Sequence, residues 1–173
     1  MKSWRISKYN PIHRDKKGAY IKQEWTSLSD VNETFDSKLF TLNEYRKTED
    51  LYINQIKQAL KENNARLLKV VELEKWEPEL VLDKNVAPIY DQKDYKIYKS
   101  LEDKDIVNIE DALIIARLNL RSDIWCKLVD FDENFEIHFG YDYYMYFTFL
   151  DNNNNLEPIS KMLFIEIFDS PHW

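Results

Sequence analysis

The residues whose types and spacing could do chemistry lie between positions 135 and 149. Glu136 and His138 are two residues apart, so they share one face of any strand that contains both. Asp142 follows His138 by four positions, beyond a predicted turn. A carboxylate beside an imidazole orients the ring and raises its pKa, which is the first half of an acid–base pair. His138 with Glu136 or Asp142 is therefore the catalytic candidate, and the alternative is a structural histidine held by hydrogen bonds.

Cys126 is the only cysteine, so the chain has no internal disulfide. A thiol activated by His138 would be a nucleophile. The alternative is a buried cysteine that behaves as a small hydrophobic residue.

The sequence predicts neither a metal site nor a cofactor site. The three histidines are far apart, without H-x-x-x-H spacing, and there is no cysteine pair. The acidic run 130–134 begins like a calcium-binding loop, but it lacks the central glycine, and its twelfth position is Tyr141. Gly18 and Gly140 are the only glycines, so the glycine-rich loops that bind phosphate groups are missing.

Aromatic residues dominate the same C-terminal segment, where they fill eight of the fifteen positions from 135 to 149. Alternation places Tyr144 and Tyr146 on one face of a strand and Tyr143, Met145, Phe147 and Phe149 on the other. One of the two faces is expected to build the core and the other to keep its rings near solvent. Amphipathic rings near solvent are common anchors of protein interfaces. The alternative is that helices cover both faces, or that tyrosine pairs only stiffen the hairpin. The predicted binding residues are Tyr141, Tyr143, Tyr144, Tyr146, Glu136 and Asp142.

The net charge of −7 is unevenly distributed along the chain. Residues 1–30 carry seven basic and three acidic residues, whereas residues 76–173 carry nine basic and twenty acidic residues. Nucleic-acid binding by the whole chain needs a basic surface, so the acidic excess argues against it. The same excess favours a basic protein partner, because complementary charges accelerate association, although it also simply keeps a protein soluble.

The N-terminal segment interleaves basic and aromatic residues between Trp4 and Lys17. Such a pattern can hold phosphate groups while it stacks nucleobases. The alternative is a solvated loop whose aromatic residues belong to the core. The sequence leaves the role of this segment open.

Two principal helices are predicted from apolar periodicity. Thr41 and Glu44 form a capping-box sequence, and apolar residues recur behind it at helical spacing until Asn63. A second helix is predicted over 109–120, where apolar residues occur nearly all round and indicate deep burial.

Alternating apolar and polar residues predict the strands. Segment 125–131 fits either a continuation of the second helix or a further strand. An asparagine-rich loop at 151–155 precedes the last strand. The predicted strands cover residues 3–9, 19–25, 66–75, 80–82, 95–98, 135–139, 143–150 and 161–168.

This order of elements predicts an α+β fold, with a mostly antiparallel sheet and the two principal helices packed on one side. A chain of 173 residues can bury a sizeable core, so residues 1–173 are expected to form a single domain. No apolar stretch approaches the ~20 residues that cross a bilayer, and the first residues lack the apolar part of a signal peptide. With its lone cysteine, the chain is expected to be cytoplasmic, without a membrane partner, as a monomer or a homodimer.

These features lead to two functional hypotheses. The small, acidic, glycine-poor and aromatic-rich chain is similar in general character to many bacterial immunity proteins, which neutralise a toxin by occupying its active cleft. This likeness is one of composition and transfers no residues. The favoured hypothesis is a cytosolic interaction protein that binds a basic partner through its acidic, aromatic C-terminal surface. The alternative is a small enzyme in which His138 works with a carboxylate.

Overall fold

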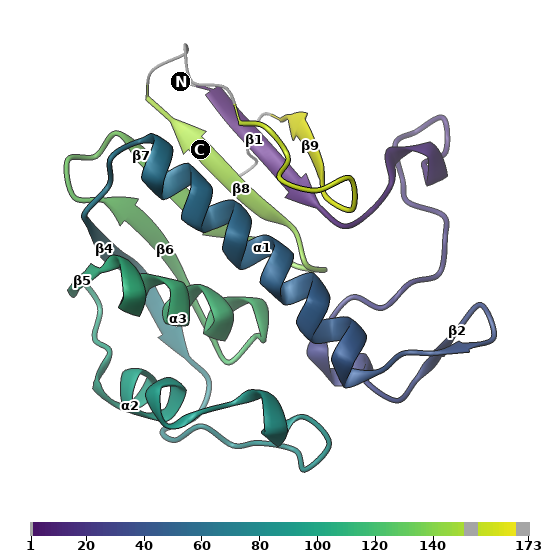
Figure 1. Cartoon of the computed structure of the whole chain (residues 1–173), viewed down its shortest axis with the longest axis horizontal. Coiled ribbons are helices and arrows are strands. Elements are labelled where there is room, and N and C mark those ends of the chain that lie inside the picture. The colour runs from purple at the N-terminus through teal and green to yellow at the C-terminus, as the bar shows by residue number, and fades with distance from the viewer. Residues whose placement is uncertain (1, 151–155, 169–173) are drawn as a thin grey trace.

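A computed structural model describes residues 2–150 and 156–168 of the chain. Its centre is a seven-stranded sheet in which every neighbouring pair of strands is antiparallel (Figure 1). In spatial order the strands are β5 (Ile106–Asn108), β4 (Leu67–Lys75), β6 (Ile124–Asp130), β7 (Phe135–Phe139), β8 (Met145–Phe149), β1 (Lys2–Ser7) and β9 (Phe164–Ile167). A separate two-stranded hairpin consists of β2 (Thr34–Phe35) and β3 (Lys38–Leu39). The α+β fold with an antiparallel sheet is confirmed.

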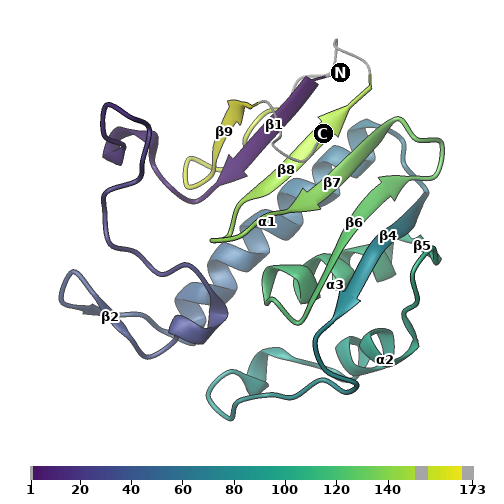
Figure 2. The same cartoon turned by 180° about the vertical axis from the view of Figure 1, so that it is seen from behind.

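The described part of the chain contains three α-helices, α1 (Leu42–Glu62), α2 (Gln92–Ser100) and α3 (Ile109–Leu120). Figures 1 and 2 show α1 and α3 on the same face of the sheet, with α2 beside α3. Thr41 caps α1 as its sequence predicts, because its hydroxyl accepts from the Glu44 amide while the Glu44 carboxylate accepts from the Thr41 amide. Within this part of the chain, no helix is long and apolar enough to span a membrane.

The hydrophobic core lies between the helices and the sheet. The residues of β6 alternate between buried and partly exposed over its whole length, because successive side chains of a strand point to opposite faces of the sheet. One face of β6 therefore belongs to the core. Its neighbours β7 and β8 contribute Phe135, Ile137, Met145 and Phe147 to the core, which α1 and α3 cover. Tyr143 and Met145, which alternation places on the same strand face, both belong to this core.

Segment 95–98, which alternation predicts as a strand, is helical and belongs to α2. Asp91 explains the difference, since its carboxylate accepts from the amides of Lys93 and Asp94 and starts a helix there. The Asp94 carboxylate in turn accepts from the Asp91 amide. The local cap therefore outweighs the alternating pattern.

Segments 19–25 and 80–82 also lie outside the strands. The first forms a single isolated bridge between Arg14 and Tyr20, and Ile21 within it is exposed. Val81 in the second segment is exposed as well. Alternation produces a strand only where a neighbouring strand takes up the backbone hydrogen bonds. In segment 19–25 only Ala19 and Ile21 have backbone hydrogen bonds of this kind, to residues 15 and 13, and no described strand pairs with segment 80–82. Segment 125–131 is a strand rather than helix, and residues 151–155 lie outside the described residues.

Candidate functional site

The turn between β7 and β8 has an unusual backbone. The Gly140 amide donates to the carbonyl oxygen of Tyr144 at 2.9 Å, and the Tyr144 amide donates to that of Tyr141 at 3.2 Å. Between them, Asp142 and Tyr143 have positive φ angles of 55° and 63°. Aspartate tolerates this left-handed region, whereas a bulky residue such as tyrosine adopts it only under constraint. The turn is therefore strained at Tyr143.

Burial of the Tyr143 side chain offsets this strain. The side chain is 5% exposed, and its ring lies edge-on to the rings of Trp25, Tyr45 and Tyr52 at centroid distances of 5.0, 5.7 and 5.0 Å. The Tyr52 hydroxyl also donates to the Tyr143 carbonyl oxygen at 2.8 Å. Helix α1, which carries Tyr45 and Tyr52, therefore holds the buried side of the turn. Tyr141, at the tip of the turn, is 92% exposed.

Next to this turn lies a cavity of about 500 Å³, which we call the turn cavity. It lies where the ends of β4, β6 and β7 meet the turn, with residues 26 and 27 of the N-terminal segment on a further side. Its volume is typical of small-ligand sites, which range over ~300–1,000 Å³. The aromatic residues that line it are Trp76, Trp125, Phe139, Tyr141, Tyr143 and Tyr144.

Two of these rings are held in place by hydrogen bonds. The indole N–H of Trp125 donates to the carbonyl oxygen of Phe139 at 2.8 Å, which ties β6 to the end of β7. The indole N–H of Trp76 donates to the carbonyl oxygen of Ser122 at 3.0 Å, although the Trp76 side chain is 58% exposed. Each indole N–H therefore already has its hydrogen-bond partner within the protein.

Glu74 and Asp142 bring two carboxylates to the lining of the turn cavity. Both residues are exposed, and neither forms an ion pair with any residue of the described ranges. None of the described lining residues is Lys or Arg. The cavity therefore combines aromatic rings with two negative charges that no cation of the described chain neutralises.

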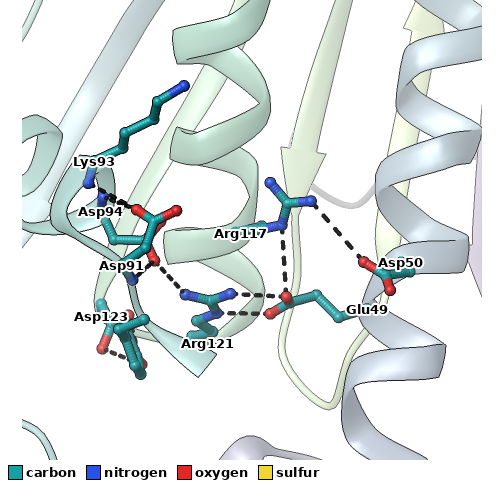
Figure 3. A network of polar contacts seen from close by, with 9 residues as sticks. Glu49, Asp50, Asp91, Lys93, Asp94, Arg117, Arg121 and Asp123 are labelled. Atoms are coloured by element: carbon teal, nitrogen blue, oxygen red, sulfur yellow. Dashed lines mark hydrogen bonds and ion pairs between the residues drawn. The ribbon is translucent and has the colours of Figure 1, made fainter. Parts of the chain in front are cut away.

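One wall of the cavity is formed by the end of α3, the turn that follows it and the start of β6, which contribute Asn119, Leu120, Ser122 and Ile124. A buried ionic network holds this turn (Figure 3). Arg121 at the end of α3 donates to both carboxylate oxygens of Glu49 at 2.7 and 2.8 Å, and to Asp94 at 3.1 Å.

This network joins the three helices, because Glu49 lies on α1, Asp94 on α2 and Arg121 at the end of α3 (Figure 3). All three side chains are buried. The guanidinium of Arg121 also lies over the ring of Tyr90, with its central carbon 4.5 Å from the ring centroid. Arg117 reaches the same Glu49 from one helical turn earlier, at 3.7 Å. The wall of the cavity is therefore supported from within the protein.

Asp123 lies in the same turn, between two lining residues. The Tyr90 hydroxyl donates to its carboxylate, with oxygen–oxygen distances of 3.2 and 2.9 Å. Burial raises the pKa of Asp123 to about 7, although Tyr90 and Arg121 oppose this shift. A carboxyl group behind the cavity wall therefore changes its charge near neutral pH.

His138, the catalytic candidate, lines the turn cavity and is 3% exposed. Its ring lies edge-on to Trp125 and Tyr146, at centroid distances of 5.4 and 5.8 Å. Glu136 lies two positions back on β7 and is buried, and burial raises the pKa of its carboxyl group. Glu136 does not line the cavity, whereas Asp142 does. The structure therefore brings His138 and Asp142 to one cavity and leaves Glu136 outside it.

Some of the predicted binding residues line the turn cavity and others do not. Tyr141, Tyr143 and Tyr144 line the turn cavity, but Tyr146 is 8% exposed and lies outside it. Tyr146 pairs with His138 across β7 and β8, and its ring edge faces Gly140, where a Cβ atom would lie 2.9 Å from it. The accessible part of the aromatic segment is therefore its turn rather than the middle of its strands.

Cys126 and His138 lie on opposite faces of the sheet. Cys126 is in the core, where its sulfur accepts from the side-chain amide of Asn119 at 3.2 Å. Trp125, the residue before Cys126 on β6, packs against His138 on the other face. Strand alternation therefore keeps the thiol and the imidazole apart. Burial raises the pKa of the Cys126 thiol to about 12.

Three basic residues of the N-terminal segment, Arg5, Lys8 and Arg14, have partners within the protein. Arg14 donates to both carboxylate oxygens of Glu166 at 2.6 and 2.7 Å, and Arg5 donates to the same carboxylate at 3.1 Å. Lys8 lies over the rings of Tyr9 and Trp25, with Nζ 4.0 and 4.1 Å from their centroids. These residues fasten the N-terminal segment to the sheet.

The sequence interpretation missed Glu74, Trp76 and Trp125 as site residues. Glu74 and Trp125 are register partners on β4 and β6, and this pairing follows only from the strand order. A β-bulge between Val71 and Glu74, with positive φ at Glu72, also changes which residues of β4 face the cavity. No local sequence signal reveals either feature.

We found no match for this chain among protein-family models, curated proteins or solved structures. Within the described ranges, no group of three or more His, Cys, Asp or Glu residues could hold a metal ion. The function must therefore be argued from the turn cavity itself.

Proposed function

We propose that this chain is an interaction protein that binds a basic partner at the turn cavity and the acidic surface around it. One observation carries the proposal: the described lining joins aromatic rings to the carboxylates of Glu74 and Asp142 and contains no Lys or Arg. Cations are attracted to the faces of aromatic rings and to carboxylates, whereas anionic ligands would meet uncompensated negative charge.

The conformation of the turn supports a role in binding. Tyr141 extends into solvent from a backbone that the buried Tyr143 holds rigid. A preorganised tyrosine loses little conformational entropy on binding, and tyrosines are enriched among the residues that contribute most to interface affinity. Tyr141 and Tyr144 are therefore the proposed anchors, and Asp142 between them supplies a charge for the basic partner.

The concrete form of this function is inhibition by occupation, in which the chain covers a basic cleft of its partner. The charge distribution supports it, because residues 76–173 carry most of the acidic excess. Long-range attraction would raise the association rate, and the rigid aromatic anchors would slow dissociation.

A peptide selection tests this function. Random peptides displayed on phage are selected on the wild-type protein and then compared on Tyr141→Ser and on Tyr95→Ser, a matched change at an exposed tyrosine outside the cavity. We expect selected peptides rich in Lys and Arg that bind less well as salt rises, lose binding on Tyr141→Ser and keep it on Tyr95→Ser. Absence of enrichment, or equal binding to Tyr141→Ser and wild type, would overturn the proposal.

The second candidate function is a small enzyme. It is favoured by one observation, the position of His138 in the wall of the same cavity as Asp142. In this function His138 acts as a general acid or base on a substrate bound in the cavity. Turnover of any member of a panel of ester, phosphoester and glycoside substrates, lost in His138→Gln, would support it. A panel without turnover would leave binding as the supported function.

A further inference from the structure

We infer that the group recognised by the turn cavity is the guanidinium of an arginine side chain presented by the partner. This inference rests on the proposed function and names the chemistry of its central contact. It follows from the aromatic rings, the unpaired carboxylates and an arrangement of the same kind inside the protein.

The aromatic part of the lining is preorganised for a flat cation. The indole N–H groups of Trp76 and Trp125 already bond to the carbonyl oxygens of Ser122 and Phe139, so a ligand need not supply partners for them. What the rings offer to a ligand is therefore their π-systems. A guanidinium stacks on such rings, and it is more weakly hydrated than an ammonium ion, which lowers its desolvation penalty in a cavity.

The carboxylates supply the second half of the recognition. Glu74 and Asp142 both line the cavity, and neither forms an ion pair within residues 2–150 and 156–168. The planar fork of a guanidinium matches a carboxylate with two parallel hydrogen bonds. A neutral or apolar ligand would remove water from these carboxylates without replacing it, which disfavours binding.

The protein already uses this combination to hold one of its own arginines. Arg121 lies over the ring of Tyr90. It also makes two hydrogen bonds to the carboxylate of Glu49 (Figure 3). Arg5 shows a looser version, with its guanidinium carbon 4.2 Å from the ring centroid of Phe168 and a hydrogen bond to Glu166. The turn cavity presents the same two components, a ring and a carboxylate. Among its rings, Tyr144 already has the guanidinium carbon of Arg5 at 5.2 Å from its centroid, so Trp76, Trp125 and Tyr141 are the rings that remain for an arginine of the partner.

The test uses two small ligands of nearly the same shape. N-acetyl-arginine-methylamide carries the guanidinium, and N-acetyl-citrulline-methylamide replaces it with an uncharged urea group. Binding is followed by the NMR signals of the tryptophan indole N–H groups, which Trp76→Phe and Trp125→Phe assign. We expect the arginine ligand to shift the signals of Trp76 and Trp125 in a saturable way and the citrulline ligand to leave them in place.

Two charge-removing variants locate the site. Glu74→Gln and Asp142→Asn keep the shape of each side chain, and asparagine tolerates the positive φ of position 142. Each is expected to weaken arginine binding by about tenfold, the equivalent of one charged hydrogen-bonded contact. Glu79→Gln and Asp132→Asn, at exposed positions outside the lining, should bind as the wild type does.

The results separate this inference from the proposed function. Equal shifts with arginine and citrulline, or equal binding by Glu74→Gln, Asp142→Asn and the wild type, would overturn the inference. Peptides that are selected by the cavity but keep their affinity after Arg→citrulline exchange would uphold the proposed function and overturn the inference. Arginine binding at Trp76 and Trp125 without any selected peptide would uphold the inference and remove the proposed function.

Discussion

The hydroxyl of Tyr52 on α1 donates a hydrogen bond of 2.8 Å to the carbonyl oxygen of Tyr143 in the turn after β7. This bond connects the buried helix to the strained backbone that presents Tyr141. The helix therefore sets the geometry of the turn cavity although it does not line it.

Tyr52→Phe is expected to destabilise the protein by about 1–3 kcal/mol, because it leaves the buried Tyr143 carbonyl oxygen without its donor. Urea unfolding followed by circular dichroism measures this change. Tyr95→Phe, at an exposed position on α2, is the control and should stay within about 0.5 kcal/mol of the wild type. Equal stability of both variants would show that the bond does not hold the turn.

Arg121→Met is expected to cost about 3–5 kcal/mol, since it leaves the buried carboxylates of Glu49 and Asp94 without their cation. Arg117→Met removes a neighbouring guanidinium that approaches the same Glu49 but is one-third exposed, and should cost at most about 1 kcal/mol. Guanidinium chloride titrations compare the two free energies of unfolding. Similar losses in both variants would contradict the central role of Arg121.

The stability of the protein is expected to depend on pH because of Asp123. Its pKa lies near 7 in the folded protein, against about 3.8 when exposed, so between these values the folded state holds a proton that the unfolded state has lost. The free energy of unfolding should therefore fall as pH rises from about 4 to 7, by up to about 1.4 kcal/mol per pH unit from this group.

Urea titrations at several pH values compare the wild type with Asp123→Asn, which should remove this contribution. Asp132→Asn, at an exposed turn position, is the control and should keep the wild-type slope. An unchanged slope in Asp123→Asn would place the titrating group elsewhere.

Cys126 is expected to be inert toward thiol reagents in the folded protein. Its sulfur is fully buried beside Asn119, and burial raises the pKa of the thiol to about 12, so little thiolate exists at neutral pH. Reaction with Ellman's reagent should become complete only in denaturant. Rapid reaction under native conditions would show that the core opens at β6.

The sequence predicts those elements whose signals are local. The capping box at Thr41, the apolar helix over 109–120 and the hairpin around Gly140 all appear in the structure, because a few neighbouring residues determine each of them. Segment 95–98 shows the limit, since its alternation is outweighed by the Asp91 cap a few residues earlier. An alternating or helical pattern of apolar residues predicts an element reliably only when the capping residues beside it favour the same element.

Only part of the candidate site can be predicted from the sequence. Tyr141, Asp142 and Tyr144 stand out in the sequence because aromatic residues crowd around one turn. Glu74 and Trp125 reach the same cavity only through the placement of β6 between β4 and β7, which no local pattern contains. Long-range pairing thus hides Glu74, one of the two carboxylates on which the charge of the site depends.

The position of β1 affects how the protein folds during synthesis. This strand pairs with β8 on one side and β9 on the other, so Lys2 meets Phe149 and Trp4 meets Ile167. During synthesis β1 therefore emerges well before either of its partners, whereas the strands of the meander from β6 to β8 follow one another closely and can pair as they emerge. Such distant pairing slows folding, since a long loop must close first. Until β8 and β9 have emerged, both edges of β1 stay unpaired and can pair with other chains.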